Sequence, residues 1–188
     1  FRSQKSIIVS GPPAIGKTTV AKGLAKEFGM QNLSGGDVLK EMAQERGFQT
    51  KGDDWWDTKE GMTFLNQRKD NYEFDKKVDE KLKEIFLKGN VVITSYTLPW
   101  LVQDGIKIWL GGSRQNSAKR MQTRDNMDIS DALEIVKKRY EENKALYKKL
   151  YGFDFGDDLS IFDIIINTDG LDAQAVLDTA IQKVRELL

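Results

Sequence analysis

The sequence contains no cysteine and no histidine, and it has only three prolines among its 188 residues. Without cysteine the chain can form neither a disulfide nor a thiolate nucleophile, and this composition is compatible with a reducing compartment. Without histidine it has no imidazole for a Ser-His triad or for a histidine-ligated zinc site. The chemistry of this protein must therefore use carboxylates, amines, guanidinium groups, hydroxyls and the backbone.

Neither sign of charge is in excess, because 29 Lys and Arg residues balance 29 Asp and Glu residues. A balanced charge does not favour nucleic acid or an acidic membrane as a partner. The apolar runs are too short to cross a bilayer, and no signal-peptide segment is recognisable. We therefore expect a soluble cytoplasmic monomer that binds small molecules and has neither a nucleic acid nor a membrane as its partner.

Short apolar runs alternate with longer helical patterns, which is typical of βαβ units and a mainly parallel sheet in an α/β fold. The length suits one domain over residues 1–188. Strands are expected at 6–10, 30–33, 91–95, 106–110 and 162–167. Helices are expected at 17–28, from about Asp37, at 71–87, from an N-cap at Ser130 toward Leu150, and at 173–188. Insertions above the sheet are expected at 47–70 and 125–160.

The segment GPPAIGKTT at residues 11–19 follows an apolar run and leads into a helical pattern. It matches G-x-x-x-x-G-K-[ST], a loop whose backbone N–H groups surround phosphate oxygens at the positive end of a helix. In this motif Lys17 reaches the β- and γ-phosphates, and the Thr18 hydroxyl is a direct ligand of Mg²⁺. We therefore predict a nucleotide-binding loop made of Gly11, Pro12, Pro13, Ala14, Ile15, Gly16, Lys17, Thr18 and Thr19.

Several further segments resemble those of nucleoside monophosphate kinases, most closely the archaeal-type cytidylate kinases. The resemblance rests on the phosphate loop and on LSGGDVLK, LPWLVQDGIKIWL, KRMQTR, KKRYEENKALYKKLYGFDF and DLSIFDIIINT. It implies a three-layer P-loop NTPase fold with a five-stranded parallel sheet in the order 2-3-1-4-5. It also implies an acceptor-binding insertion at about 35–75 and a mobile lid at about 120–156.

The activity that this resemblance implies is transfer of the γ-phosphoryl group of ATP, with Mg²⁺ as cofactor, to CMP or dCMP. Such a transfer needs positive charge around the moving group and exclusion of water, with little covalent work by the protein. The resemblance assigns this charge to Lys17 and to the lid residues Arg120, Arg124 and Arg139. Arg120 and Arg124 are spaced i, i+4 and so share a helix face. The alternative is that the three arginines are solvated helix charges.

The resemblance assigns acceptor binding to Ser34, Gly36, Asp37 and Lys40, and we also expect Ser95, at the end of the third expected strand, to bind the acceptor. Lys40 stands where the family usually has Arg, which grips a phosphate through two parallel hydrogen bonds, whereas Lys supplies a point charge. Asp37 is the nearest acid by motif position, and we expect it to hold the metal through water. Trp55 and Trp56 either stack on a base or form a small local core.

The segment after the third expected strand departs from the family pattern. Where the family has an acid and an Arg after VV, this chain reads VVITSYTLPW and places Ser95 and Tyr96 there. P-loop enzymes generally put an acid at this strand end. AMP as the acceptor and a nucleotide-binding protein that has lost phosphotransfer therefore stay open as alternatives. A P-loop hydrolase or switch is disfavoured, because NTDG at 167–170 lacks the Lys of an N-K-x-D motif.

Overall fold

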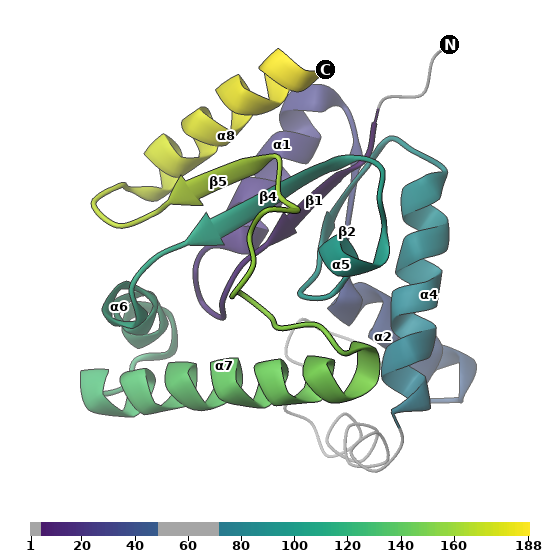
Figure 1. The fold of residues 1–188 in the computed structure, drawn as a ribbon. Coiled ribbons are helices and arrows are strands. Elements are labelled where there is room, and N and C mark those ends of the chain that lie inside the picture. Colours follow the sequence, from purple (N-terminus) through teal and green to yellow (C-terminus); the bar gives the residue numbers. More distant parts are fainter. Residues whose placement is uncertain (1–4, 49–71) are drawn as a thin grey trace.

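The computed structural model describes residues 5–48 and 72–188, and within them five parallel strands form one sheet in the order β2-β3-β1-β4-β5 (Figure 1). Both the parallel sheet and its order confirm the predicted fold. Trp55 and Trp56, for which the sequence leaves base stacking and a small local core open, lie outside the described residues. The strands are β1 (Ile7–Ser10), β2 (Gln31–Ser34), β3 (Val91–Thr94), β4 (Ile106–Gly111) and β5 (Ile164–Asn167).

The three central strands are buried on both faces, as their continuous apolar character predicts. Strand β5 lies at an edge and alternates, so that Ile164 is buried while Ile165 is half exposed. Because the strands are parallel, their carboxyl ends meet at one edge of the sheet. The register pairs Ser34 with Thr94 and Ser10 with Trp109, which brings the segments after β1, β2, β3 and β4 together there.

Helices cover both faces of the sheet. Helix α1 (Lys17–Phe28) and helix α8 (Ala173–Leu187) pack on one face around a shared apolar core, while α2 (Gly35–Glu45), α4 (Glu73–Leu87) and the short α5 (Leu98–Leu101) lie on the other side (Figure 1). In residues 5–48 and 72–188, no helix combines the length and the apolar character needed to cross a membrane.

Helices α6 (Arg114–Asp125) and α7 (Ile129–Tyr151) lie next to each other near the end of β4, with α6 seen nearly end-on beside the amino-terminal end of α7 (Figure 1). The prediction that Ser130 caps α7 is wrong. The helix begins at Ile129 and Asp128 is its N-cap residue, although Asp128 makes no side-chain cap hydrogen bond. Ser130 therefore lies in the first turn, where its hydroxyl is exposed to solvent.

The second helix begins at Gly35, two residues before the expected start, because of a local cap. The Ser34 hydroxyl accepts a hydrogen bond from the Asp37 backbone N–H at 3.2 Å, and the Asp37 carboxylate accepts one from the Ser34 N–H at 2.9 Å. This reciprocal pair is a capping box, which satisfies backbone donors that a helix start leaves free.

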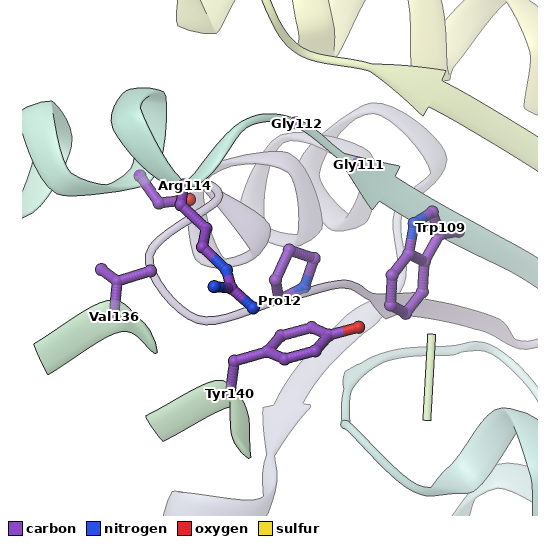
Figure 2. Close-up of a pocket in the computed structure, with 8 residues that line it drawn as sticks. Pro12, Trp109, Gly111, Gly112, Arg114, Val136 and Tyr140 are labelled. Atoms are coloured by element: carbon purple, nitrogen blue, oxygen red, sulfur yellow. The ribbon is translucent and has the colours of Figure 1, made fainter. Parts of the chain in front are cut away.

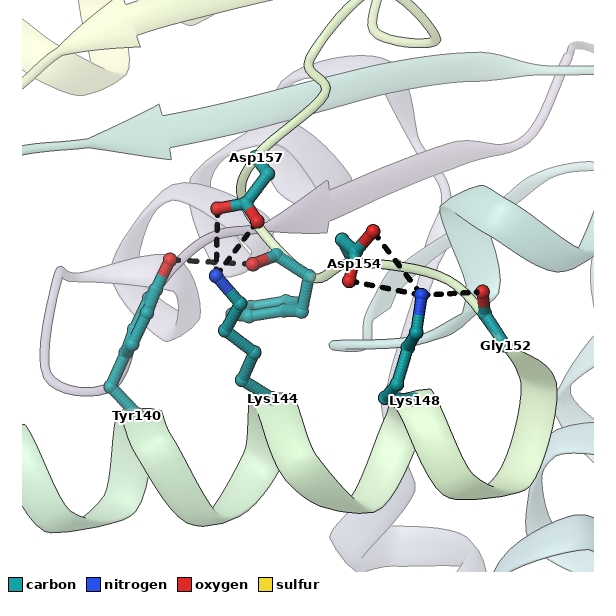
Figure 3. A network of polar contacts seen from close by, with 7 residues as sticks. Tyr140, Lys144, Lys148, Gly152, Asp154 and Asp157 are labelled. Carbon is teal, nitrogen blue, oxygen red and sulfur yellow. Dashed lines mark hydrogen bonds and ion pairs between the residues drawn. The ribbon is translucent and has the colours of Figure 1, made fainter.

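The carboxyl-terminal half of α7 is tied to the segment that follows it (Figure 3). Lys144 pairs with Asp157 at 2.7 Å and Lys148 pairs with Asp154 at 3.2 Å. Beneath these exposed pairs lies an aromatic cluster whose centre, Phe155, is fully buried. We call this group the aromatic cluster; it consists of Tyr96, Trp100, Trp109, Tyr140, Tyr147, Phe153, Phe155 and Phe162.

Candidate active site

The loop between β1 and α1 has the backbone conformation of a phosphate cradle. Its φ angles are positive at Gly11 (153°), Ala14 (56°) and Gly16 (103°). A Cβ on Gly11 would lie 2.4 Å from the carbonyl oxygen of Leu110, so no other residue fits there without a shift of the backbone. Helix α1 begins directly after Gly16 without a side-chain cap. Its first N–H groups therefore point from the positive end of the helix into the loop.

Lys17 is folded back onto this loop. Its Nζ donates hydrogen bonds to the carbonyl oxygens of Pro12 at 2.6 Å and Gly11 at 3.1 Å, and it lies 4.5 Å from the centre of the Tyr96 ring. The side chain is 9% exposed. This burial lowers the pKa of Lys17 to about 7, since the charged ammonium has lost most of its hydration. A bound phosphate would supply the opposite charge that stabilises the ammonium.

A cavity of about 480 Å³ lies over the loop, and we call it the loop cavity. It brings the three arginines predicted from the sequence together with the phosphate loop. Its lining consists of Pro13, Ala14, Ile15, Gly16, Lys17, Thr18, Thr19, Tyr96, Arg120, Met121, Arg124 and Arg139. Seven of the nine predicted loop residues therefore line this cavity. The other two, Gly11 and Pro12, contribute the carbonyl oxygens that accept hydrogen bonds from Lys17.

The three arginines differ in how they are held. A Cβ added to Gly16 would lie 2.7 Å from Nη1 of Arg120, which shows how closely this guanidinium approaches the loop. Arg124 donates to both carboxylate oxygens of its neighbour Asp125, at 2.8 and 2.9 Å. That paired contact raises the pKa of Arg124 and lowers the pKa of Asp125. Arg139 reaches the cavity from the exposed face of α7.

A second cavity, of about 390 Å³, lies at the carboxyl ends of β2 and β3, and we call it the strand-end cavity. It adjoins the loop cavity, because Lys17, Thr18 and Tyr96 line both. The full lining is Lys17, Thr18, Ser34, Gly35, Gly36, Leu39, Asp75, Val78, Asp79, Leu82, Thr94, Ser95, Tyr96, Thr97, Asn143, Leu146 and Tyr147.

Three of the predicted acceptor residues, Ser34, Gly36 and Ser95, line the strand-end cavity. Within the described part of the chain, the lining of the two cavities does not include Asp37 or Lys40. The Asp37 carboxylate accepts from the backbone N–H and the hydroxyl of Ser34, both at 2.9 Å, and its side chain is exposed. Lys40 lies one turn further along α2 and is half-buried.

Ser95 shapes the loop that follows β3. Its hydroxyl oxygen accepts hydrogen bonds from the backbone N–H groups of Thr97 at 3.2 Å and Leu98 at 3.1 Å. Its own N–H donates to the carbonyl of Val9 at 3.2 Å, which extends the pairing of β1 and β3 by one residue. Ser95 therefore fixes the backbone on either side of Tyr96.

Asp79 is a cavity residue that sequence reasoning missed. It lies on α4, is 9% exposed, and accepts hydrogen bonds from the hydroxyls of Thr97 at 2.7 Å and Tyr151 at 2.5 Å. Burial and this bond to Asp79 raise the pKa of Tyr151. The spacing of the acids could have indicated this residue. Asp75 and Asp79 are four residues apart, and they lie on the helix face that also carries the buried Val78.

In residues 5–48 and 72–188, no group of three acidic side chains is arranged to hold a metal ion. Beside phosphates, Mg²⁺ is usually bound through one or two protein groups, with water and phosphate oxygens completing the octahedron. The Thr18 hydroxyl is exposed at the start of α1 and lines both cavities, which fits such a ligand.

A third pocket, of about 260 Å³, lies behind the phosphate loop (Figure 2). It meets the loop only at Pro12; its other walls are Trp109, Gly111 and Gly112 from β4 and the segment after it, together with side chains of α6 and α7. The guanidinium of Arg114 lies 5.8 Å from the ring centre of Tyr140. Apart from Pro12, its lining includes none of the residues that the sequence assigned to a site.

The five-stranded parallel sheet and the glycine-containing loop between β1 and α1 place the chain in the class of P-loop nucleotide-binding proteins. Comparison with known families narrows this class. The model of the cytidylate kinase-like family matches residues 6–170, and the chain belongs to that family. The predicted resemblance to nucleoside monophosphate kinases of the archaeal cytidylate kinase type is thereby confirmed.

Individual relatives agree with this assignment. The cytidylate kinase of Sulfurisphaera tokodaii is 35% identical over 171 residues, which cover 88% of this chain and 87% of the relative. That of Methanocaldococcus jannaschii is 33% identical over 177 residues, covering 92% and 93%. Among solved structures, shikimate kinase from Acinetobacter baumannii, in complex with shikimate, superposes with a TM-score of 0.60 over 100% of this chain and 96% of that one. At 18% identity, this last likeness shows the fold alone.

Proposed function

We propose that this protein transfers the γ-phosphoryl group of ATP to CMP or dCMP. The observation that carries the proposal is the junction of the two cavities at Lys17, Thr18 and Tyr96. A donor on the phosphate loop and an acceptor in the strand-end cavity would meet there. An oxygen of the acceptor phosphate then bonds to the γ-phosphorus, the bond from that phosphorus to the β–γ bridging oxygen breaks, and ADP leaves.

The loop cavity is the proposed donor site. The loop N–H groups and the start of α1 bind the phosphates of ATP, and Lys17 exchanges its two carbonyl partners for phosphate oxygens. Bound Mg²⁺ would add positive charge across the β- and γ-phosphates. Thr18 is the proposed direct ligand of the metal, and Asp37 is proposed to hold one of its waters while it continues to cap α2.

Helices α6 and α7 form the proposed lid, within residues 120–156. Arg120, Arg124 and Arg139 supply positive charge to the transferring group, and the lid excludes water when it closes. Arg124 must leave Asp125 to reach a phosphate. The ties between Lys144, Lys148 and the segment after α7 support a lid whose moving part is α6 with the amino-terminal half of α7.

The strand-end cavity is the proposed acceptor site, formed with the proposed insertion at 35–75. Its phosphate end is the start of α2, where the backbone N–H groups of Gly35 and Gly36 lie in the first turn of the helix and Lys40 adds positive charge nearby. Its other end carries the carboxylates of Asp75 and Asp79. Carboxylates accept hydrogen bonds, and cytosine presents an exocyclic amine that donates them. This end therefore favours an amino base such as cytosine over uracil, whose corresponding group is a carbonyl.

AMP is the alternative acceptor. Adenine also carries an exocyclic amine, which can donate hydrogen bonds to the two carboxylates. The cavity volume does not separate the two bases, so a direct assay must do so. The protein is incubated with ATP, Mg²⁺ and, in turn, CMP, dCMP, UMP, AMP or GMP, while ADP formation is followed. We expect ADP with CMP and dCMP.

Each other result of this assay has a distinct meaning. ADP with AMP alone would make the protein an adenylate kinase. ADP without any acceptor would indicate a hydrolase, and ATP binding without ADP would indicate that phosphotransfer has been lost. Lys17→Ala is the matched negative control, since it removes the ammonium from the junction and leaves the loop glycines in place.

A further inference from the structure

The pocket of about 260 Å³ that meets the phosphate loop at Pro12 has no part in the proposed function, and we call it the rear pocket. Among the residues that the structure describes, its lining contains one charged side chain, that of Arg114, and no carboxylate. In Figure 2 this side chain extends from α6 toward Pro12 and Tyr140, and the indole of Trp109 lies beyond Pro12. The rear pocket therefore combines one positive charge with aromatic walls.

The charge of Arg114 lies at an unfavourable place on its helix. Arg114 is the first residue of α6, directly after the N-cap residue Ser113, and the first turn contains no acidic residue. The positive end of the helix dipole lies there and disfavours a cation. Arg114 is exposed, and within the described part of the chain its guanidinium has no ion pair. The carboxylate of Asp169 instead accepts from the Ser113 N–H at 3.1 Å. A bound anion would relieve the unfavourable placement of this charge.

Two further hydrogen-bond donors line the rear pocket. Ser117 is 1% exposed and Trp109 is 5% exposed. Neither the Ser117 hydroxyl nor the Trp109 indole N–H makes a hydrogen bond to another described residue. A Cβ on Gly111 would lie 3.3 Å from Nε1 of Trp109, so the missing side chain leaves room beside this N–H. Because buried polar groups are nearly always hydrogen-bonded, water or a ligand must satisfy these two donors.

We propose that the rear pocket binds a small planar carboxylate, at a site apart from the proposed donor and acceptor sites. The carboxylate would accept two parallel hydrogen bonds from the Arg114 guanidinium and one from the Ser117 hydroxyl. A flat ring attached to it would pack against Tyr140, Pro12 and Trp109. An apolar cavity of about 150 Å³ holds a benzene molecule, so the volume of the rear pocket suits one ring that carries a carboxylate.

The rear pocket is less suited to a polyphosphate than the loop cavity is. One guanidinium matches the two oxygens of a single carboxylate, whereas the loop cavity offers backbone N–H groups and several cations. The flat walls of the rear pocket also favour a ring over a tetrahedral group. The proposal therefore commits to an aromatic or heteroaromatic monocarboxylate.

The first test titrates nitrogen-15-labelled protein with benzoate, the simplest ligand of this class, and follows the indole N–H signals by NMR. The chain has four Trp residues, and Trp109→Phe assigns the signal of Trp109. We expect this signal to shift saturably, with a Kd on the order of 1 mM, as is usual for so small a ligand. Benzamide has the same shape without the charge and should bind about tenfold more weakly or worse. Absence of a saturable shift with benzoate would overturn the proposal.

A pair of matched variants locates the binding site. Arg114→Gln removes the charge from the rear pocket, whereas Arg124→Gln makes the same change at an exposed position of α6 in the loop cavity. We expect Arg114→Gln to weaken benzoate binding by about 10- to 100-fold, and Ser117→Ala by about 2- to 10-fold. Arg124→Gln should bind benzoate as wild type does. Loss of binding in Arg124→Gln, but not in Arg114→Gln, would place benzoate in the loop cavity and refute the proposal.

The second test measures an effect on activity and rests on the proposed function. The walls of the rear pocket come from β4, the phosphate loop, α6 and α7, so a ligand there joins the proposed lid helices to the sheet. A lid held in this way closes less readily, which lowers kcat. We therefore expect benzoate to inhibit CMP phosphorylation without competing with ATP, and Arg114→Gln to resist this inhibition. Inhibition that ATP relieves would instead assign benzoate to the donor site.

The two proposals fail separately. If no acceptor is phosphorylated, the proposed function is wrong, and the NMR titration still decides whether the rear pocket binds a carboxylate. If CMP is phosphorylated and benzoate does not shift the Trp109 signal, the proposed function stands and the proposed ligand site is wrong.

Discussion

The loop cavity and the strand-end cavity share one wall but are built in opposite ways. Much of the loop cavity comes from one continuous stretch, residues 13–19, and its remaining walls come from α6, α7 and Tyr96. The strand-end cavity draws on α1, β2, α2, α4, the end of β3 and α7, so its residues are scattered over more than 130 positions of sequence. A site made of one segment can be recognised as a motif, whereas a site assembled by the fold must be seen in three dimensions.

The same contrast applies to charge. The loop cavity gathers the Lys17 ammonium and three guanidinium groups, which suits a polyphosphate. The strand-end cavity shares only Lys17 with this set and places Asp75 and Asp79 at its other end. One cavity is therefore suited to bind negative charge throughout, and the other to bind a molecule that is negative at one end and donates hydrogen bonds at the other.

The strongest test of the loop cavity is Lys17→Ala. Removing a preorganised charged group from a transfer site typically lowers kcat by about 10²- to 10³-fold, and we expect a loss in this range. The midpoint of thermal unfolding should change little, because the ammonium is directed at loop carbonyls and not into the apolar core. Near-normal turnover in a folded variant would remove Lys17 from the mechanism.

Arg124→Ala tests whether the α6 charges act in the transition state. We expect kcat to fall by about 10²-fold, with a much smaller rise in KM for ATP, because an interaction made mainly in the transition state affects kcat most. Lys119→Ala, at an exposed position on the same helix, is the control and should retain full activity. Equal kcat in both variants would show that Arg124 is an ordinary solvated charge paired with Asp125.

Asp79→Asn tests the acidic end of the strand-end cavity. Hydrogen bonds to a charged group contribute about 1.5–3 kcal/mol, so we expect kcat/KM for CMP to fall by about 10- to 100-fold. The ratio of kcat/KM for CMP to that for UMP is the decisive measurement, since partial unfolding affects both substrates alike. That ratio should shrink, because an amide can donate to the uracil carbonyl. An unchanged ratio would limit Asp79 to holding Thr97 and Tyr151.

Asp37→Asn separates a metal role from a capping role at the edge between the two cavities. If Asp37 holds a metal-bound water, the Mg²⁺ concentration for half-maximal rate should rise by about tenfold. Ser34→Ala is the control, because it removes the cap hydroxyl and should cost about 1 kcal/mol of folding stability without changing the Mg²⁺ requirement. If both variants lose only stability, the acid serves the helix alone.

Much of the fold could be predicted from the sequence, because its signals are local. Apolar runs rich in β-branched residues identified four of the strands, and the weakest strand prediction, MQNL at 30–33, overlaps β2. A single apolar face followed by Gly29 gave helix α1 its observed bounds. The start of α7 was placed wrongly because Asp128 and Ser130 are both common N-cap residues, and sequence alone could not choose between them. The start of α2 was missed because the Ser34–Asp37 capping box is a variant with Asp in place of Glu.

The scattered parts of the site could not be predicted for physical reasons. A lone Asp within a charged helix is usually solvated, and nothing local shows that Tyr151, 72 positions away, hydrogen-bonds to Asp79. Tyr96 was noticed as a departure from the family pattern, but its contact with Lys17 depends on where β1 and β3 lie in the sheet. The lowered pKa of Lys17 is likewise a product of burial by distant segments.

The aromatic cluster gives the molecule an optical signature of its own. The ring centres of Trp100 and Trp109 lie 6.4 Å apart, with the ring planes nearly perpendicular. Trp100 also stacks on Phe153, with 4.6 Å between the ring centres. Rings held in one asymmetric arrangement produce near-ultraviolet circular dichroism, which disappears when fixed packing is lost. Because Tyr96 and Tyr147 belong to the same cluster and line the strand-end cavity, this signal would report acceptor binding without any label.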